Sequence, residues 1–449
     1  MVAKKVCRPL KRSKTGLETE FHVIDQKGKI SNKAHEIISS LKNTHKNIDV
    51  TKEIGKNMIE FGCYPGVSAE SPTLDLIDSI QKGLEISKKK GLMFYPFATY
   101  PGKFKPKFSD TGGYDIKTKI FGSDRIENAC RATGFHHHYS LPKSVFDAKL
   151  KILKLMRKSK LERSMVASYN FEIAADPALT LFTQSSPFIE GEYLAKDSRT
   201  LIYRGGKKLK YMDGLYSRFQ QIGGLPPYKQ TVTDLLISLS KRWLRWKKEV
   251  NKANPAVDFD LLYPFKLDIG WHPVKINKHG TLEQRGMDIN YLSIVVAVTL
   301  LLKYILKHIQ REFIEVLPAD FAIDEPFKLE NNILYIPPHT YVRNHLQFWS
   351  AHKGYDKKEM HYYAKRLYHL GRLLTPKSHQ KIIRPLYNMI DSKKSVSDDI
   401  INYAKRMNYL DENNKISNSD AARLALYYAG TFPKDLNDTK KLLEKTACL

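Results

Sequence analysis

The chain of 449 residues is 42% hydrophobic, which provides enough apolar side chains for a large core and excludes an intrinsically disordered segment. Its four cysteines (Cys7, Cys63, Cys130 and Cys448) show no paired metal-ligand spacing and no disulfide framework, so we expect reduced thiols in a cytoplasm. The N-terminal residues lack the apolar stretch of a secretion signal. The longest apolar run, residues 292–302, is about half the length that spans a bilayer and predicts a buried helix.

The formal net charge is +27, and a basic surface attracts phosphates without any sequence specificity. The lysines are nevertheless spread along the whole chain, without zinc-finger spacing, an RNP-like aromatic motif or a helix-turn-helix pattern. Solvated lysine-rich faces are therefore favoured over a nucleic-acid partner. Acidic small substrates such as nucleotides also suit this charge, and a homo-oligomer remains open.

The first third of the sequence alternates β-rich runs with helical ones. An apolar period of about 3.6 residues predicts a helix over residues 72–87, and the lysines at 88–90 suit the negative end of its dipole. Runs of β-branched and aromatic residues predict strands at residues 17–25, 57–63, 91–99 and 134–141.

The second half of the sequence is mainly helical. Residues 235–252 place Leu235, Trp243 and Trp246 opposite a basic face. Contact with a membrane or nucleic acid is one interpretation of this pattern, and a docked surface helix with its lysines in water is the favoured one. We further predict a strand at 281–285, an apolar helix beginning near Tyr291, and an almost wholly helical region from residue 357, which ends in the polar segment 411–419 and a last short helix.

No internal repeat, low-complexity segment or Gly/Ser linker divides the chain. We therefore predict a single catalytic domain over residues 1–449. Within it, a sheet-based core would occupy about 15–355 and a helical C-terminal portion about 356–449.

The stretch TGLETEFHVID, residues 15–25, has an acidic strand face. Because successive side chains of a strand alternate between faces, Glu18, Glu20 and His22 share one side and the apolar residues share the other. Neighbouring carboxylates repel each other, and a divalent cation would remove that cost. An amphipathic surface strand has the same pattern, so this stretch alone leaves both interpretations open.

Three more segments carry similar side chains: Glu53 and Glu60 before and within a predicted strand, His136 and His138 on one face of another, and Glu283 beside Arg285 on a third. Each has an ordinary explanation, such as an exposed polar edge for the histidines or a local ion pair for the glutamate and arginine.

Together these residues have the composition of a magnesium–nucleotide site. Mg²⁺ prefers carboxylate oxygens and completes its shell with water or substrate phosphate. An arginine beside it offers the planar donors that fit a phosphoryl group. No Walker loop or dinucleotide fingerprint is present, so metals and basic side chains would have to anchor ATP. We therefore predict one ATP–metal site that consists of Glu18, Glu20, Glu53, Glu60, His138, Glu283 and Arg285.

The order of these segments resembles the glutamate–cysteine ligase type 2, or carboxylate–amine ligase, family. The resemblance extends over roughly residues 15–410. The matching stretches, in chain order, are GLETEFHVID, the Glu53 and Glu60 pair, YPFATYP, TGFHHHYSLP, SSPFIEGEYLAKDSRTLIYR, GTLEQRGMD and YVRNHLQFWSAHKG.

The resemblance implies an α+β fold that is glutamine-synthetase-like. A large curved antiparallel sheet with flanking helices would hold ATP and two or more Mg²⁺ ions on its concave face, and a helical portion would follow. Glu53 and Glu60 would join Glu20 at one metal, whereas His138 and Glu283 would join Glu18 at another. Arg285 and Glu283 would be catalytic, with Arg285 against the phosphates. Ser186 of the SSPF loop (residues 185–188), Arg204 and His136 would bind substrate or nucleotide.

The resemblance also implies a reaction. The enzyme would phosphorylate the γ-carboxylate of L-glutamate with ATP and join the acyl phosphate to the amine of L-cysteine, giving γ-glutamylcysteine for glutathione biosynthesis. No serine–histidine or cysteine–histidine motif demands a covalent nucleophile, and Cys63 is interpreted as a packing residue. The alternatives are a ligase for another carboxylate and amine, and a non-catalytic basic protein of the same fold that binds nucleic acid or a membrane surface.

Overall fold

The computed structural model describes residues 13–109, 114–156 and 159–447. Cys7, Cys448 and the N-terminal segment without a predicted secretion signal lie outside the described residues.

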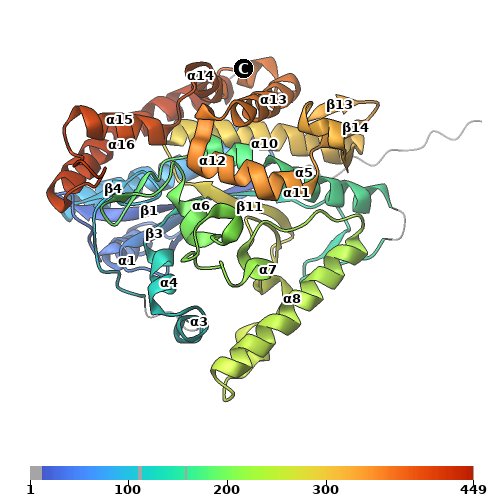
Figure 1. Ribbon diagram of the computed structural model, residues 1–449, viewed down its shortest axis with the longest axis horizontal. Coiled ribbons are helices and arrows are strands. Elements are labelled where there is room, and N and C mark those ends of the chain that lie inside the picture. The colour runs from blue at the N-terminus through green and yellow to red at the C-terminus, as the bar shows by residue number, and fades with distance from the viewer. Residues whose placement is uncertain (1–12, 110–113, 157–158, 448–449) are drawn as a thin grey trace, which may run out of the picture.

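A seven-stranded antiparallel sheet forms the centre of the protein (Figure 1). Its strand order is β10-β11-β5-β1-β3-β2, and β4 pairs with the C-terminal part of β1. β1 is central because β3 lies along one of its edges while β5 and β4 share the other. The strands are β1 (Thr15–Asp25), β2 (Val50–Lys52), β3 (Met58–Gly62), β4 (Leu92–Tyr95), β5 (Gly134–Ser140), β10 (Val274–Asn277) and β11 (Thr281–Asp288).

Alternation along the strands gives this sheet one apolar face. On β1, Phe21 packs against Phe94 of β4 and Phe432 of α16, with ring centroids 5.8 and 5.3 Å apart. Burying each such side chain contributes about 1.5–3 kcal/mol, which keeps the alternation in register. The helices that cover this face are α2 (Glu70–Lys89), α10 (Leu292–Glu312) and α16 (Asn418–Ala447).

Two long helices lie in the core. Helix α10 is the one helix among the described residues that is long and apolar enough to cross a membrane, and most of it is buried inside the protein, as predicted for the run at 292–302. Helix α5 (Lys160–Thr183) packs against α10 and β11 and is buried on all sides from Ser164 onward.

Helix α8 (Val232–Ala253) extends away from the sheet at the bottom of Figure 1. It buries Leu235, Leu239 and Trp246, and the Trp246 ring stacks on Phe121 with a centroid separation of 5.7 Å. Arg242 is buried with them, whereas Lys241, Arg245, Lys248 and Lys252 are exposed on the outer face, so α8 is a docked surface helix.

The remaining elements are short or peripheral. The helices are α1 (Ala34–Thr44), α3 (Tyr114–Phe121), α4 (Ser123–Glu127), α6 (Ser198–Tyr203), α7 (Gln220–Gly223), α9 (Phe259–Leu262), α11 (His339–Tyr341), α12 (Gln347–Lys353), α13 (Lys358–Leu374), α14 (Arg384–Ser392) and α15 (Val396–Arg406). A small sheet joins β12 (Glu315–Pro318), β14 (Ile333–Ile336) and β13 (Lys328–Glu330), and two hairpins join β6 (Phe146–Asp147) to β7 (Ile152–Leu153) and β8 (Phe188–Ile189) to β9 (Glu192–Tyr193).

The structure confirms the mixed helix and sheet class and corrects two predicted elements. The strand predicted at 91–99 ends at Tyr95, because Pro96 has no N–H to continue the ladder. The last helix is not short: α16 has 30 residues and continues through Pro433, with Phe432, Leu436 and Leu443 buried. Cys63 is buried and its sulfur accepts a hydrogen bond from the backbone N–H of Leu17, at 3.1 Å.

Candidate active site

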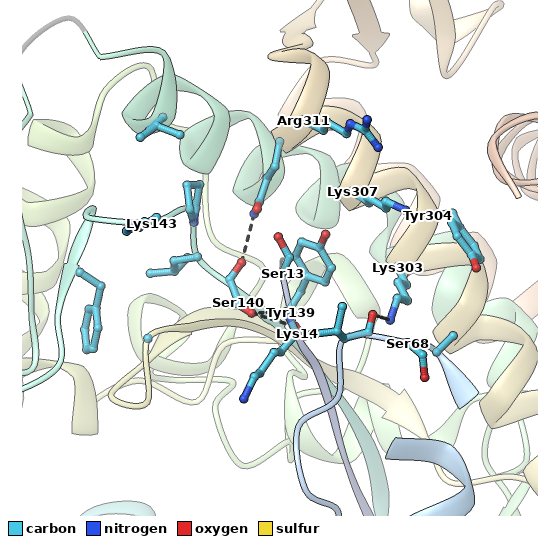
Figure 2. Close-up of a pocket in the computed structure, with 18 of the residues that line it drawn as sticks. Ser13, Lys14, Ser68, Tyr139, Ser140, Lys143, Lys303, Tyr304, Lys307 and Arg311 are labelled. Atoms are coloured by element: carbon cyan, nitrogen blue, oxygen red, sulfur yellow. Dashed lines mark hydrogen bonds between the residues drawn. The ribbon is translucent and has the colours of Figure 1, made fainter. Parts of the chain in front are cut away.

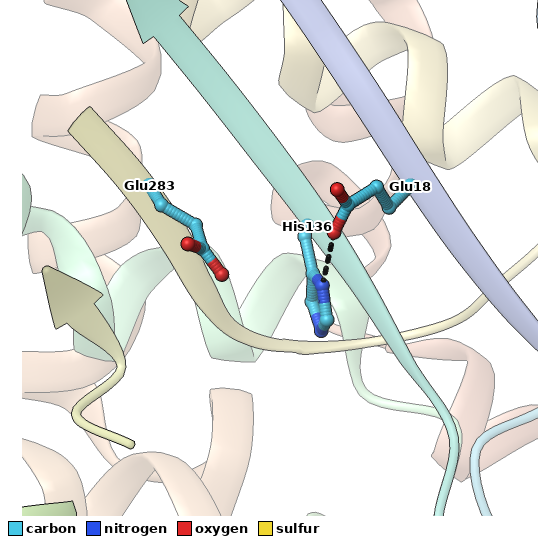
Figure 3. A group of neighbouring side chains, drawn as sticks. All are labelled: Glu18, His136 and Glu283. Carbon is cyan, nitrogen blue, oxygen red and sulfur yellow. Dashed lines mark hydrogen bonds and ion pairs between the residues drawn. The ribbon is translucent and has the colours of Figure 1, made fainter. Parts of the chain in front are cut away.

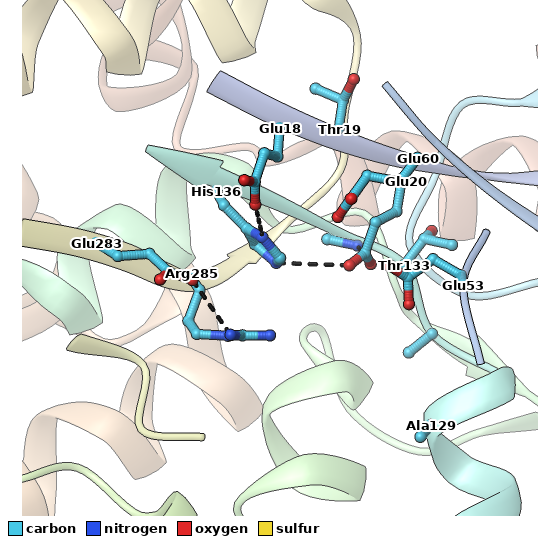
Figure 4. Close-up of polar contacts among 12 residues, drawn as sticks. Glu18, Thr19, Glu20, Glu53, Glu60, Ala129, Thr133, His136, Glu283 and Arg285 are labelled. Carbon is cyan, nitrogen blue, oxygen red and sulfur yellow. Dashed lines mark hydrogen bonds and ion pairs between the residues drawn. The ribbon is translucent and has the colours of Figure 1, made fainter. Parts of the chain in front are cut away.

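The polar face of the sheet gathers the acidic residues that the sequence separates by up to 265 positions. Strand pairing places Glu18 opposite His136, Glu20 opposite Glu60, and Glu283 opposite His138. Paired residues point to the same side of a sheet, so one face carries all of these side chains. Arg285 follows on β11, and Glu53 lies in the loop after β2 (Figure 4).

Glu18 contacts two histidines, His136, which Figures 3 and 4 show beside it, and His138. Its Oε2 is 3.0 Å from Nδ1 of His136 and 3.3 Å from Nε2 of His138. Nδ1 of His138 lies 3.0 Å from the hydroxyl of Thr281. Burial opposes ionisation of Glu18, but His138 and His136 together hold its pKa well below the usual range, and Glu18 in turn raises the pKa of His138 against the effect of burial.

Glu20, Glu53 and Glu60 form the acid-rich end of the cluster. Glu20 accepts a 2.6 Å hydrogen bond from the backbone N–H of Gly134, and Glu60 accepts one of 2.6 Å from the Thr51 hydroxyl. Desolvation and the charge of Glu20 raise the pKa of Glu53 to about 8. Desolvation and the neighbouring carboxylates, Glu53 first, raise the pKa of Glu60 well above its usual value. This end therefore holds a proton at neutral pH.

Glu283 lies at the opposite end among cations and donors. Its carboxylate accepts a 3.1 Å bond from Arg285, a 2.5 Å bond from the Asn277 amide, and has the Lys275 ammonium at 3.8 Å. Although burial raises the pKa of Glu283, Lys275 and Arg285 outweigh it and lower that pKa far below the usual range. Burial and the nearby Arg285 lower the pKa of Lys117 to about 8, and the Lys117 ammonium lies 5.1 Å from the Trp271 ring centroid.

Two groups of side chains offer the ligand set of a metal ion. One is Glu18, His136 and Glu283, and the other is Glu20, Glu60 and His136; within each group the ligand atoms lie within 4.8 Å of one another. His136 belongs to both. The buried Nε2 of His136 lies 3.5 Å from Oε1 of Glu20 and makes no hydrogen bond to the described residues, so both atoms can face a shared cation (Figure 4). Carboxylate oxygens with one imidazole nitrogen fit a hard divalent cation.

A small cavity of about 50 Å³ adjoins this cluster. It is lined by Glu20, Arg199, Tyr203, Tyr216, Trp271 and Arg285, among others. Arg199 extends from α6 over the Tyr203 ring, 5.0 Å from the ring centroid. Its Nη2 donates a 3.3 Å hydrogen bond to the backbone carbonyl of Arg285, and its Nε has no hydrogen-bond partner in the described part of the chain.

The sequence reasoning did not identify Arg199, Lys117 or Lys275. Lys275 could have been predicted from the sequence. The segments VKIN, NKHG and TLEQR have the strand–turn–strand pattern of a hairpin, and this hairpin places Lys275 opposite Glu283. Arg199 and Lys117 could not have been predicted, since each lies on a helix that only the tertiary fold brings to the sheet.

Two predicted substrate-binding residues lie in supporting positions. Arg204 lines the cavity, but its guanidinium is held by the buried Asp176, at 2.5 and 2.9 Å, and by Gln347 at 2.8 Å. Ser186 is fully buried, and its hydroxyl accepts a 3.3 Å hydrogen bond from the backbone N–H of Arg199. His136, by contrast, lies within the acidic cluster.

No family model and no curated protein sequence matches the chain. Among solved structures, the fold is similar to the glutamate–cysteine ligase of Francisella tularensis in complex with AMP, with a TM-score of 0.56, 11% identity, and coverage of 97% of this chain and 93% of that one. It is also similar to a bifunctional glutathione synthetase from Pasteurella multocida, with a TM-score of 0.53, 11% identity, and coverage of 93% of this chain. The chain spans about half (52%) of that bifunctional enzyme. The resemblance indicated by the sequence motifs is thus confirmed as a shared fold: this chain has the fold of a glutamate–cysteine ligase.

Proposed function

We propose that this protein is an ATP- and Mg²⁺-dependent carboxylate–amine ligase, which activates the γ-carboxylate of L-glutamate and joins it to L-cysteine. The observation that carries the proposal is the acidic cluster itself. Four strands and one loop place five carboxylates and two histidines on one sheet face beside Arg285, in the fold of an enzyme that joins the same two amino acids.

The described residues fit the metal that this function needs. Glu20, Glu53 and Glu60 would hold one Mg²⁺, and Glu18, His136 or His138, and Glu283 a second. When bound, Mg²⁺ neutralises the phosphate oxygens of ATP during phosphoryl transfer. Desolvation and neighbouring carboxylates raise the pKa values of Glu53 and Glu60, and a bound divalent cation would offset that electrostatic cost, which supports the proposal.

Amide formation requires an activated acyl group, because hydroxide is a poor leaving group. The substrate carboxylate oxygen attacks the γ-phosphorus of ATP, the bond to the β-phosphate oxygen breaks, and ADP leaves. The amine then attacks the acyl carbon of the acyl phosphate, loses a proton and displaces inorganic phosphate. Arg285, which bonds to Glu283 through one nitrogen, has further guanidinium N–H groups to donate to the transferring phosphoryl oxygens.

Arg199 is the proposed anchor for a substrate carboxylate. Its guanidinium lines the cavity beside Glu20, whereas Arg204 is occupied by Asp176 and Gln347. In this proposal Arg204 and Ser186 act through their neighbours: Arg204 fixes the cavity wall, and Ser186 holds the backbone of Arg199.

The glutamine-synthetase-like architecture, the single catalytic domain and the cytoplasmic location belong to the same proposal. A large antiparallel sheet with a ligand-bearing face supports the architecture. The proposed dependence of the enzyme on ATP supports the cytoplasmic location. The intact acidic cluster weighs against a non-catalytic basic protein, because neighbouring buried carboxylates destabilise a protein that does not use them.

Phosphate release from Mg·ATP, screened over pairs of amino acids with the product identified by mass, tests the function. We expect turnover with glutamate plus cysteine. Turnover with another pair alone would keep the chemistry and replace the substrates, and no turnover with any pair would refute the ligase.

Variants then test the site. Glu18→Gln and Glu283→Gln should lower turnover at least a hundredfold while circular dichroism stays native, whereas Glu36→Gln, on the exposed side of α1, should retain it. Unchanged turnover in both cluster variants would refute the assignment of the site.

A further inference from the structure

A second cavity, of about 1190 Å³, lies at the end of the sheet where β5 finishes and the β10–β11 turn begins (Figure 2). Its wall includes Ser140 at the end of β5, Gly280 in the turn, and Tyr304 on α10. None of the acidic-cluster residues lines it. Tyr139, which does, is next to His138 on β5 and therefore points to the opposite, helix-covered face of the sheet.

The wall of this cavity is strongly basic. Helix α10 supplies Lys303, Lys307 and Arg311 at intervals of four residues, which places them along one side of the helix. Lys14, before β1, and Lys143, after β5, add cations from other elements (Figure 2).

Few acidic side chains in the wall balance the charge of these cations. Glu70 is the one acidic residue among the described residues of the wall, and its carboxylate already contacts Nε2 of His379. Arg311 has a 3.6 Å contact to Glu312, in which both side chains are mostly exposed, and such a pair contributes little.

Lys303 is the most informative member of the wall because it is 96% buried, with a relative exposure of 4%. Its ammonium donates a 2.6 Å hydrogen bond to the backbone carbonyl of Val67 and lies within ion-pair distance of no carboxylate in the part of the chain that is described. An ammonium has three donors, so two remain for a ligand. Burial, together with the nearby Lys307, lowers the pKa of Lys303 to about 8 even though the charge of Glu70 acts in the opposite direction, and a bound anion would raise this pKa again.

Hydroxyl groups accompany the cations. Ser13, Ser68, Ser144 and Tyr304 line the same hollow. Cations and hydroxyl donors together are the groups that bind phosphate and carboxylate oxygens. The volume is sufficient for a small molecule, since ligand pockets range from about 300 to 1000 Å³.

We propose that this cavity is a second binding site, separate from the acidic cluster, for a small polyanion that carries two or more phosphate or carboxylate groups. The cations surround one hollow and come from three separate elements, which suits a compact ligand better than an extended nucleic-acid strand.

Titration calorimetry with inorganic tripolyphosphate, in metal-free buffer of moderate ionic strength, tests the proposal, and citrate in a second series separates phosphate from carboxylate recognition. Lys307→Gln/Arg311→Gln removes two exposed cations of the wall. Lys241→Gln/Arg245→Gln removes one lysine and one arginine with the same spacing from the exposed side of α8, and is the matched control. Arg285→Gln reports on binding at the acidic cluster.

We expect the wall variant to weaken the binding of at least one of the two anions tenfold or more, and the control and Arg285→Gln to change it less than twofold. Equal weakening by the wall variant and its control would reveal general charge attraction and overturn the site. Loss of binding in Arg285→Gln, or no binding of either anion to the wild type, would overturn it as well. A short single-stranded oligonucleotide that binds more tightly than both anions, and that loses binding in the wall variant alone, would replace the small polyanion by nucleic acid.

Discussion

Binding of Mg²⁺ should release a proton from the acid-rich end of the cluster. Desolvation and Glu20 raise the pKa of Glu53 to about 8, so at pH 7 about nine molecules in ten carry a proton there. A divalent cation binds only the ionised carboxylate. Each ion bound should therefore release about 0.9 proton at pH 7 from Glu53, and Glu60, whose pKa is also raised, adds to this release. From Glu53 alone the apparent affinity should rise about tenfold, or about 1.4 kcal/mol, between pH 7 and pH 9.

Titration calorimetry of MgCl₂ in buffers of different ionisation enthalpy measures this proton release directly. Glu53→Gln should bind Mg²⁺ more weakly and release fewer protons than the wild type. Glu36→Gln carries the same chemical change on the exposed side of α1 and should match the wild type in both respects. Proton release that is absent at pH 7, or that survives undiminished in Glu53→Gln, would contradict the reasoning.

Three further predictions concern stability. Burial lowers the pKa of His22 to about 4, and its neutral ring accepts a hydrogen bond from Asn57 and donates one to a backbone carbonyl. Because the unfolded state binds the proton more tightly, about 3 kcal/mol of stability should be lost as pH falls from 6.5 to 4. The free energy of unfolding in urea should depend less on pH in His22→Gln than in the wild type, and the exposed His345→Gln should behave like the wild type. Arg204→Met leaves the buried Asp176 without its ion-pair partner and should cost about 3–5 kcal/mol by chemical denaturation. Lys415→Met, which removes one partner of an exposed pair, is the control and should leave the denaturation midpoint nearly unchanged. Phe432→Ala empties the space against the sheet and should cost about 3–5 kcal/mol, with a smaller loss for Phe432→Leu; equal values for the two variants would argue against a packed contact.

The sequence pattern predicted β1, β3, β5, β11 and the start of β4, but it did not predict β2 or β10. Because side chains alternate between the faces of a strand, spacing alone predicted that Glu18 shares a face with Glu20 and Glu283 with Arg285, although both faces of these strands are largely buried. Pairing register could not be read, because it depends on contacts between strands far apart in the chain. The acidic cluster was therefore predicted from residue type and resemblance, and its geometry came from the fold.

Helix α5 shows why periodicity misses part of the core. It is buried on every side from Ser164 onward, so its sequence has no polar stripe, and Pro177 in its interior is typical of a helix break. The carbonyl of Pro177 accepts hydrogen bonds from Ser350 at 2.8 Å and Thr180 at 3.2 Å. Asp176, which holds Arg204, was missed with the helix that carries it.

The two ends of the acidic cluster differ in how their charge is balanced, and this difference suggests an order of binding. Glu283 is ionised and already neutralised by Lys275 and Arg285, so a cation there must compete with two positive side chains. At Glu53 and Glu60 a cation competes with bound protons, and a divalent cation gains more Coulomb energy there than a proton does. The first Mg²⁺ should therefore bind at the Glu53 end without nucleotide. A second should bind at the Glu283 end only together with the triphosphate, whose oxygens offer Arg285 a new partner and so free Glu283 for the metal.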